Sequence, residues 1–514
     1  MKISARDLLG GLLDPGSFVS WDRPPVPIAA SPEYRAELRA AESVAGTDEA
    51  VLTGEGLLRG RRVAVIACEF GFLAGSVGVA AAERIVSAVE RATELGLPLL
   101  ASPTSGGTRM QEGTVAFVQM VKIAGAVATH KAAGFPYLVY LRDPTMGGVF
   151  ASWGSLGHMT FAEPGALIGF LGPRVYKALY DRDFPPGVQT AENLYRNGVI
   201  DGVVPVRVFR RIAHRALSVL SGTPNVLNGI PAAHSEYSQG TATLDGSLAK
   251  PVYSTDIPAW RSVSISRRPD RPGIRALLRH ATERVPLSGT GQGESDRTVV
   301  LALARFRGRP CVVFGHDRAG QTTETTMGPA ALREARRSMH LAQELRVPLV
   351  LVIDTAGAAL SREAEERGLA PEIARCLADL VTLDTPTVSV LLGQGTGGGA
   401  LALLPADRVL AAAHGWLAPL PPEGASAIVH RDTDHAPEIA AAQGIRSADL
   451  LRDGIVDRIV GEYPDAADEP VEFARRMVAA IAAELADLTA RPLEELRSDR
   501  RLRYRRLGGP DHFL

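Results

Sequence analysis

The feature that most constrains the fold is an internal duplication. A strand-like apolar segment that ends in glycines occurs once in each half of the chain, and two other segments also recur at a separation of about 250 residues. The matched segments are 138–148 with 388–399, 99–107 with 349–357, and 191–201 with 447–457. Three pairs in the same order predict two tandem domains of one fold.

The size of the chain agrees with two domains. Its 514 residues and mass of 54.5 kDa are sufficient for two units of about 220 to 250 residues each. The segment 221–263 is rich in Gly, Pro, Ser and Thr and lacks apolar periodicity, which is typical of a linker. We therefore predict an N-terminal domain at 1–220 and a C-terminal domain at 264–514.

Each half alternates short apolar runs with longer helical patterns. Such alternation predicts an α/β fold, whose ligands gather at the carboxyl ends of the strands. The strands expected in the first half are 62–67, 97–101 and 136–141, with helices at 78–95 and 113–132. The strands expected in the second half are 298–304, 310–314 and 348–353, with a helix at 329–344.

Glycines stand at the end of the apolar run in both halves. Gly147 and Gly148 follow 138–141 and precede a helical pattern at 149–156, and Gly397–Gly399 stand in the same place in the second half. The first N–H groups of a helix lack internal partners and lie at its positive end, so they can stabilise a developing oxyanion. The alternative is that the glycines only form turns. Their repetition favours two sites for two substrates, each carrying an oxyanion.

A further polar loop is expected beside the first glycine pair. The segment Ser105–Gly113 follows a predicted strand and contains Gly106, Gly107 and Arg109. Arg109 could bind a phosphate or carboxylate of a ligand. A surface salt bridge with Glu112 is the competing interpretation.

Composition excludes several classes of function. The net charge of −1 and the pI near 6.9 give no basic field for nucleic acid or an anionic membrane. Three scattered cysteines without CxxC spacing predict reduced thiols in a cytoplasmic protein, with Cys68 and Cys311 in the core. There is no HExxH or GxSxG motif, and His158 is expected to be structural.

Two arginine-rich stretches are expected to face solvent. Arg333, Arg336 and Arg337 recur at helical spacing, and the tail 497–506 is rich in arginine. The alternatives are an anion site for the first stretch and a docking surface for an acidic partner on the second.

Several motifs together resemble one family. The motifs of the first half are SGGTRMQEG at 105–113, DPTMGGV at 143–149, EPGALIG at 163–169 and GPR at 172–174. Those of the second half are RRPDRP at 267–272, IDTAGA at 353–358, EERG at 365–368, GGGA at 397–400 and PEGAS at 422–426. With these motifs the first half resembles the beta subunit of acetyl-CoA carboxylase carboxyltransferase, and the second half resembles the alpha subunit, so the chain is similar to a fusion of the two.

The resemblance implies two crotonase-like domains and a carboxyltransferase activity. Carboxybiotin on a carrier protein would donate its carboxyl group to the alpha carbon of a short acyl-CoA, with acetyl-CoA giving malonyl-CoA and propionyl-CoA as a possible second substrate. The implied partners are biotin carboxylase and biotin carboxyl carrier protein. A homodimer or larger homo-oligomer and a role in fatty acid biosynthesis are also implied, with no metal.

The resemblance also assigns roles to residues. Gly147 and Gly148 would stabilise the thioester enolate, and Gly398 and Gly399 the ureido oxygen of biotin. The substrate-binding residues would be Gly106, Gly107, Arg109 and Gly169. The cofactor-binding residues would be Gly357, Gly397 and Ala400.

Two other functions remain open from the sequence. A biotin-independent decarboxylase of a malonyl thioester would need only one oxyanion site. A non-catalytic scaffold of a carboxylase complex would need none, and retention of both glycine groups argues weakly against it. The sequence departs from the family in lacking the four-cysteine zinc ribbon often found in bacterial beta subunits, and in having Ala356 where proline is usual.

Overall fold

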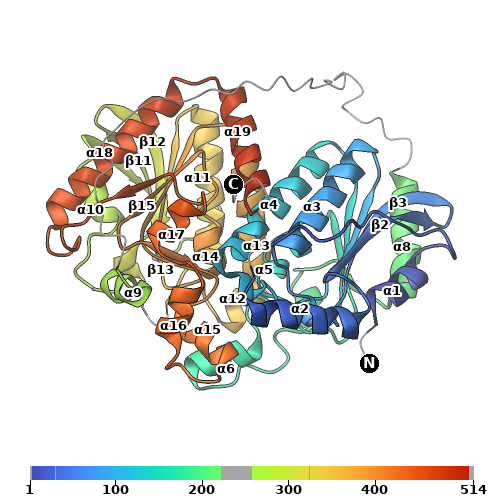
Figure 1. Ribbon diagram of the computed structural model, residues 1–514. Helices are drawn as coiled ribbons and strands as arrows, with labels where there is room; N and C mark the ends of the chain where they lie inside the picture. Colours follow the sequence, from blue (N-terminus) through green and yellow to red (C-terminus); the bar gives the residue numbers. More distant parts are fainter. Residues whose placement is uncertain (1–2, 29, 221–256, 323–324, 509–514) are drawn as a thin grey trace.

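The computed structural model describes residues 3–28, 30–220, 257–322 and 325–508. It contains two α/β lobes, with α4, α13 and α19 between them (Figure 1). The first sheet has the strand order β1-β2-β3-β4-β5-β7-β9, and the second has the order β10-β11-β12-β13-β14-β15-β17, with β16 paired to β14. Most of the predicted linker lies outside the described residues.

The first-lobe elements up to β5 alternate as the sequence predicts, although β1, β2, β6 and the elements from β7 to α8 were not anticipated. Its helices are α1 (Ala5–Leu12), α2 (Pro32–Ala45), α3 (Val79–Glu94), α4 (Gly113–Ala132), α5 (Gly147–Phe150), α6 (Pro173–Tyr180), α7 (Ala191–Arg196) and α8 (Val206–Val219). Its strands are β1 (Val19–Ser20), β2 (Val51–Leu58), β3 (Arg61–Cys68), β4 (Leu99–Ser102), β5 (Tyr137–Leu141), β6 (Thr145–Met146), β7 (Met159–Ala162), β8 (Ile168–Gly169) and β9 (Gly202–Val203).

The second lobe repeats this plan and adds helices at its end. Its helices are α9 (Ala259–Ser266), α10 (Ile274–Arg279), α11 (Pro329–Leu345), α12 (Arg362–Glu366), α13 (Leu369–Thr382), α14 (Gly397–Leu401), α15 (Pro422–Val429), α16 (Ala436–Ala442), α17 (Ser447–Arg452), α18 (Pro470–Thr489) and α19 (Leu493–Arg506). Its strands are β10 (Glu283–Leu287), β11 (Val299–Phe306), β12 (Arg309–His316), β13 (Leu349–Thr355), β14 (Thr387–Thr396), β15 (Arg408–Ala412), β16 (Trp416–Ala418) and β17 (Arg458–Val460).

The two sheets share one topology, which confirms the predicted duplication. In each lobe an antiparallel hairpin, β2–β3 or β11–β12, is followed by parallel strands. Ala64 lies opposite Leu99 in the first sheet, and Val312 lies opposite Leu349 in the second. Parallel strands are covered on both faces and so consist of nearly continuous apolar residues. All seven residues of β13 are buried accordingly.

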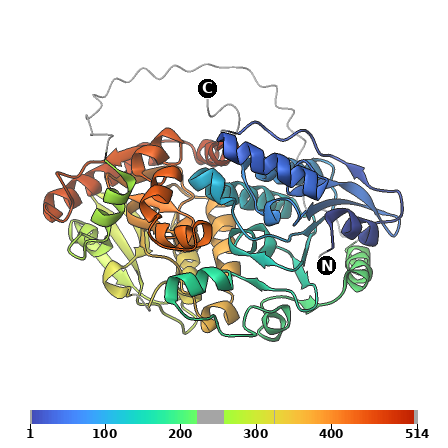
Figure 2. The same ribbon diagram turned by 60° about the horizontal axis from the view of Figure 1, so that its bottom comes forward.

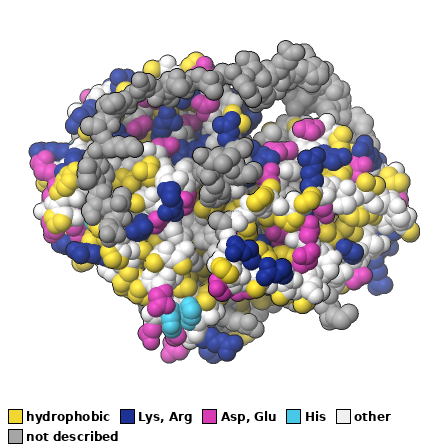
Figure 3. All heavy atoms as spheres, in the orientation of Figure 1, with side chains coloured by type: hydrophobic (Ala, Val, Ile, Leu, Met, Phe, Trp, Pro, Cys, Tyr) yellow, Lys and Arg dark blue, Asp and Glu magenta, His cyan; other side chains and the backbone are white. Residues whose placement is uncertain are grey.

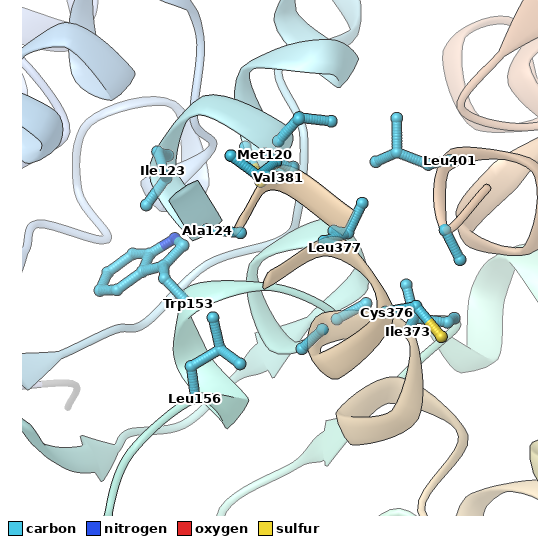
Figure 4. Close-up of a cluster of buried hydrophobic side chains, with 14 of the residues drawn as sticks. Met120, Ile123, Ala124, Trp153, Leu156, Ile373, Cys376, Leu377, Val381 and Leu401 are labelled. Carbon is cyan, nitrogen blue, oxygen red and sulfur yellow. The ribbon is translucent and has the colours of Figure 1, made fainter. Parts of the chain in front are cut away.

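The two lobes pack through a continuous apolar core. Helices α4 and α13 lie against each other, and Met120 and Ala124 of one face Leu377 and Val381 of the other (Figure 4). A Cβ placed on Gly125 would lie only 2.9 Å from Val381 Cγ1, so glycine permits this close approach. Because buried apolar contact is the main stabilising force, the lobes are expected to fold as one unit.

Further contacts join the lobes at both ends of the molecule. Helix α6 of the first lobe lies beside α15 of the second (Figures 1 and 2). At the other end, Arg505 of α19 forms ion pairs with Glu83 and Glu90 of α3. The carbonyl of Leu507 accepts a hydrogen bond from Gln119 of α4 at 3.0 Å.

The prediction that the tail 497–506 is an exposed helix face is wrong. Arg500 is 1% exposed, and its guanidinium binds Asp407 at 2.7 and 2.8 Å together with three backbone carbonyls. Arg503 binds Asp457 at 2.5 Å. A buried guanidinium needs a carboxylate partner to offset the loss of water, and these aspartates provide it.

Three other expectations also need correction. The helix expected at 149–156 ends at Phe150, and only a single 3₁₀ turn at Trp153–Ser155 follows. Helix α9 begins at Ala259 and packs against Trp416, so part of the predicted linker belongs to the second lobe. The arginines of α11 are not a freely solvated face, since Arg333 pairs with Glu294 and Arg336 with Asp379.

Candidate functional site

The first glycine turn, Gly147–Gly148, lies at the carboxyl end of the first sheet. Strand β6 pairs with β8 so that Met146 lies opposite Gly169, and α5 begins at the next residue. Gly147 has a φ of 62°, which favours glycine. A Cβ on Gly148 would lie 2.9 Å from Thr108 Oγ1. Both glycines are partly exposed.

The loop predicted to face this turn does so. Gly107 adopts a φ of 120°, and its N–H donates to Ser105 Oγ at 3.0 Å while that hydroxyl donates back to its carbonyl at 3.2 Å. A Cβ on Gly147 would lie 3.4 Å from Gly107 Cα and 3.8 Å from Gly106 O. The structure therefore brings Gly106, Gly107 and Gly147 together.

The second glycine turn, Gly397–Gly399, has the same local geometry. Gly397 begins α14 with a φ of 63°, and Gly357 of the facing loop has a φ of 142°. The N–H of Gly357 donates to Thr355 Oγ1 at 3.1 Å, as Gly107 does to Ser105. This turn is buried, and so is Ala400 behind it.

The dihedral angles correct the alignment of the two turns. The sequence pairing placed Gly148 opposite Gly399, yet the positive φ identifies Gly397 as the counterpart of Gly147. Gly148 therefore corresponds to Gly398. The run of three glycines hides this register from the sequence, because any two of them fit the pattern.

The glycines of both turns lie at the starts of the short helices α5 and α14. The first N–H groups of a helix have no partner within that helix, so amides at these two turns can donate to a ligand. Amide donors in a site that excludes water stabilise negative charge strongly, since they need no reorganisation when the charge develops. Each turn can therefore stabilise one oxyanion.

Phe170 joins the two turns. A Cβ on Gly147 would lie 4.0 Å from the Phe170 carbonyl oxygen, and a Cβ on Gly398 would lie 2.8 Å from the Phe170 ring. Gly169, predicted to bind substrate, is the preceding residue and packs against the amide of Gln189. The two turns thus lie at the junction of the lobes and not on opposite surfaces.

Arg109 does not fit its predicted role as a ligand-binding residue. Its side chain is fully buried, with its guanidinium bound to Glu49 at 2.5 and 3.0 Å and to the Ser76 carbonyl at 2.8 Å. The expected bridge to Glu112 exists at 3.4 Å but is buried and not on the surface. A buried charge needs such partners, and through them Arg109 fixes the loop from the protein interior.

Other predicted structural residues occupy the expected places. His158 Nδ1 accepts a hydrogen bond from the Tyr137 N–H at 3.0 Å, which confirms its structural role. Cys68 and Cys311 are buried free thiols, as predicted for the core. Burial raises the pKa of the Cys68 thiol to about 11, so this group stays protonated near neutral pH.

Sequence reasoning missed Glu365 and Gln189, which contact the segment between the turns. Glu365 of α12 accepts hydrogen bonds from the Phe170 N–H at 2.8 Å and from Gln189 Nε2 at 2.6 Å. Burial raises the pKa of Glu365 to about 7. The only signal in the sequence was the motif at 365–368, which does not reveal what its carboxylates contact.

One face of the molecule shows how the side-chain types are distributed (Figure 3). Acidic, basic and apolar side chains are intermixed over the face drawn in Figure 3. Within the described ranges, no helix is long and apolar enough to cross a bilayer.

Comparison with known proteins identifies the class. A family model described as the carboxyl transferase domain matches residues 3–497. The chain therefore belongs to the carboxyl transferase family, as the sequence resemblance predicted.

Particular relatives share nearly the whole chain. A probable biotin-dependent acyl-coenzyme A carboxylase beta3 subunit of Mycobacterium tuberculosis H37Rv is 64% identical over 510 residues, covering 99% of both chains. The acetyl-coenzyme A carboxylase carboxyl transferase subunits beta/alpha of Salinispora arenicola are 39% identical, covering 99% of this chain and 91% of theirs. Among solved structures, the transcarboxylase 12S is 20% identical with a TM-score of 0.38, covering 96% of this chain and 91% of that one.

Proposed function

We propose that this protein is the carboxyltransferase component of a biotin-dependent acyl-CoA carboxylase. Carboxybiotin on a carrier protein supplies the carboxyl group, and an acyl-CoA accepts it at its alpha carbon. Family membership over residues 3–497 supports the reaction class. The observation that carries the mechanism is the pair of glycine turns, each at the start of a short helix and both next to Phe170.

Each turn has one chemical task in this proposal. The amides of Gly147 and Gly148 stabilise the enolate oxygen of the acyl-CoA, with Gly106, Gly107 and Gly169 shaping the surrounding site. Those of Gly398 and Gly399 stabilise the biotin ureido oxygen, with Gly357, Gly397 and Ala400 fixing that turn. The leaving ureido nitrogen can accept the alpha proton, so the chain need not supply a general base.

Small neighbouring groups surround the glycine at the start of each turn. At Gly147 the nearest atoms to an added Cβ are backbone atoms of Gly107 and Gly106. At Gly397 the nearest atom is the Pro419 carbonyl oxygen, at 3.3 Å. At Gly147 the positive φ favours glycine, and at Gly397 the positive φ and the close Pro419 carbonyl both favour it.

The proposal also specifies the length of the acyl group. We expect a short acyl-CoA, with acetyl-CoA converted to malonyl-CoA and propionyl-CoA as the next candidate. The test is a coupled assay of the purified protein with biotin carboxylase, biotinylated carrier, ATP, bicarbonate and acyl-CoAs of increasing chain length. Product formation that depends on the carrier and is greatest with a short acyl-CoA is expected. No carboxylated product from any acyl-CoA would contradict the proposal.

A biotin-independent malonyl-thioester decarboxylase is the alternative enzyme. It would use the first turn alone, so biotin and the substitution Gly398→Val would leave malonyl-CoA decarboxylation unchanged. We expect the opposite, because both turns present the first N–H groups of a helix. A scaffold without catalytic activity would bind the carrier and show no turnover in the coupled assay.

Assembly and location complete the proposal. We expect a cytoplasmic homodimer or larger homo-oligomer that acts with biotin carboxylase and the biotin carboxyl carrier protein, at the step that supplies malonyl-CoA for fatty acid biosynthesis. Duplicated halves suit an assembly in which a first lobe and a second lobe from different chains complete a site. Light scattering of an active preparation that gave only a monomer would contradict this part.

A further inference from the structure

A buried carboxylate of the second lobe contacts the segment between the glycine turns. Glu365 is 5% exposed, and its Oε1 accepts hydrogen bonds from the Phe170 N–H at 2.8 Å and from Gln189 Nε2 at 2.6 Å. Both donors belong to the first lobe. The Glu365 side chain therefore connects α12 to the first-lobe segments that contain Phe170 and Gln189.

Gln189 completes the cluster. Its Nε2 also donates to the Leu171 carbonyl at 2.7 Å, and the amide packs against Gly169, where an added Cβ would lie 2.5 Å from Nε2. Both amide hydrogens are used in this way, while Gln189 Oε1 is buried without a partner among the described residues. A buried unpaired oxygen is costly, which indicates that the amide orientation is fixed by Glu365 and Leu171.

The cluster determines where Phe170 lies, and Phe170 touches both turns. Its carbonyl oxygen approaches Gly147, and its ring covers Gly398 at 2.8 to 2.9 Å from an added Cβ. A displacement of this residue would alter the surroundings of both turns together. Displacements of about 1 Å in a catalytic site can reduce rates by about 100-fold.

We propose that Glu365, with Gln189, is a positioning residue for carboxyl transfer that couples the two glycine turns by fixing Phe170. This inference rests on the proposed function and extends it to residues that touch neither substrate. Glu365 acts through the Phe170 N–H, and Gln189 acts through Glu365 and the Leu171 carbonyl.

The surroundings of Glu365 also make its charge sensitive to pH. The groups that face its carboxyl are neutral donors: the N–H groups of Phe170 and Leu171 and the Gln189 amide. The charged neighbours on α12 and α7 interact with one another, since Glu366 pairs with Arg362 at 3.0 Å and is also attracted by Arg196. Desolvation without a nearby cation raises the pKa of Glu365 to about 7.

The test compares Glu365→Ala and Glu365→Gln in the coupled carboxylation assay, with the full chain and its carboxylase partners. Alanine leaves the Phe170 N–H and one Gln189 hydrogen without an acceptor, so kcat is expected to fall at least about 10-fold with little change in the KM for acyl-CoA. Glutamine keeps an acceptor and is expected to retain kcat within about threefold. Its kcat should also lose the part of the wild-type pH dependence that lies near pH 7.

Glu366→Gln is the matched control. Glu366 is adjacent on α12 and also crosses to the first lobe, where it accepts from Asn193 Nδ2 at 3.0 Å, but no contact with Phe170 is recorded among the described residues. We expect this variant to resemble the wild type. If Glu365→Ala does not fold, the pH profile of Glu365→Gln carries the test alone. A wild-type profile in Glu365→Gln, or equal kcat losses in Glu365→Ala and Glu366→Gln, would overturn the inference. Absence of transfer by the wild type would instead contradict the proposed function.

Discussion

The two glycine turns have nearly the same backbone and different surroundings. Gly147 and Gly397 have φ values of 62° and 63°, and each faces a loop glycine that hydrogen-bonds a hydroxyl side chain two residues before it. The first turn is partly exposed, whereas the second is buried beneath Phe170 and Ile373. Duplication therefore preserved the amides and changed the access to them.

This difference suggests how the two substrates are handled. An open turn can admit a ligand directly, while the covered turn is reached only past residues that first-lobe contacts fix in place. Phe170 belongs to the first lobe but covers the turn of the second. The second turn therefore depends on the junction of the lobes, and the first depends mainly on its own loop. The following predictions test this contrast.

The largest effect is expected at the buried ion pair between Arg109 and Glu49, which supports the loop that faces the first turn. Arg109→Met should lower the free energy of unfolding by about 3 to 5 kcal/mol, because it leaves the carboxylate of Glu49 buried without its partner. Urea denaturation provides the measurement. In the double variant Arg109→Met/Glu49→Leu, part of the loss should be recovered.

The same variant tests the role of Arg109 directly. If Arg109 contacted acyl-CoA, the folded Arg109→Met protein would show a large increase in the KM for acyl-CoA and little loss of stability. The buried geometry predicts the reverse. A KM increase of tenfold or more at wild-type stability would show that the first turn depends on this arginine as a ligand.

The second prediction concerns the pH dependence of stability at the junction. The pKa of Glu365 is raised from 4.5 to about 7 in the folded protein, so the native state retains a proton that the unfolded chain has released. The stabilising contribution of the protonated Glu365 to the free energy of unfolding is therefore fully present below about pH 4.5. It is lost as the pH rises from 4.5 through 7. Between these values the stability of Glu365→Gln relative to wild type should increase by about 3 kcal/mol.

Urea denaturation of both proteins from pH 4.5 to 7.5 measures this difference. Other titrating groups are common to the two proteins, so they largely cancel. A stability difference that does not change with pH would mean that Glu365 is ionised over the whole range. The position of Phe170 over the second turn would then not depend on the titration of Glu365.

A smaller effect is expected from the ring that covers the second turn. Phe170→Leu keeps the backbone carbonyl and N–H but shortens the side chain over Gly398. We expect the KM for free biotin in the reverse reaction to change several-fold, while the KM for malonyl-CoA stays within about twofold. Equal changes in both constants would show that the ring serves the two turns alike.

The smallest effect is expected at the far end of the junction. Arg505 pairs with Glu83 and Glu90 at 2.7 Å, but its side chain is 33% exposed. Such pairs contribute about 0.2 to 1 kcal/mol each, so Arg505→Ala should cost little more than that. Activity at both turns should be unchanged. A loss of activity would indicate that α19 influences the site as well as the packing of the lobes.

Much of the fold could be predicted from local sequence. Apolar runs at 138–141 and 349–353 and the glycines after the first run and after β14 are short-range signals, and both copies appeared at their expected ends of strands. Helix α4 even begins and ends at the predicted residues, Gly113 and Ala132. Repetition strengthened each assignment because a pattern read in one half could be checked in the other.

The failures involve partners distant in the chain. Arg109 pairs with Glu49, sixty residues earlier, and Arg500 pairs with Asp407, 93 residues earlier. An arginine in an otherwise polar segment gives no sign of such a partner, so both were expected to face solvent or a ligand. Phe170 and Glu365 are 195 residues apart, and their contact follows only from the packing of the two lobes.

The central claim is that each turn serves one partner in carboxyl transfer. It is tested most directly by Gly148→Val and Gly398→Val, whose added Cβ atoms would lie within 2.9 Å of existing side chains. Biotin-dependent carboxylation and malonyl-CoA decarboxylation with free biotin should be measured for both variants, with folding checked by circular dichroism.

Valine keeps the backbone N–H, but its side chain must displace the turn and with it the amide donors. Loss of an oxyanion donor costs about 2.7 to 4 kcal/mol of transition-state stabilisation, which corresponds to a rate reduction of about 100- to 1,000-fold. We predict a reduction of this size for both variants in both reactions. A Gly398→Val protein that folds and transfers carboxyl groups at the wild-type rate would contradict the account.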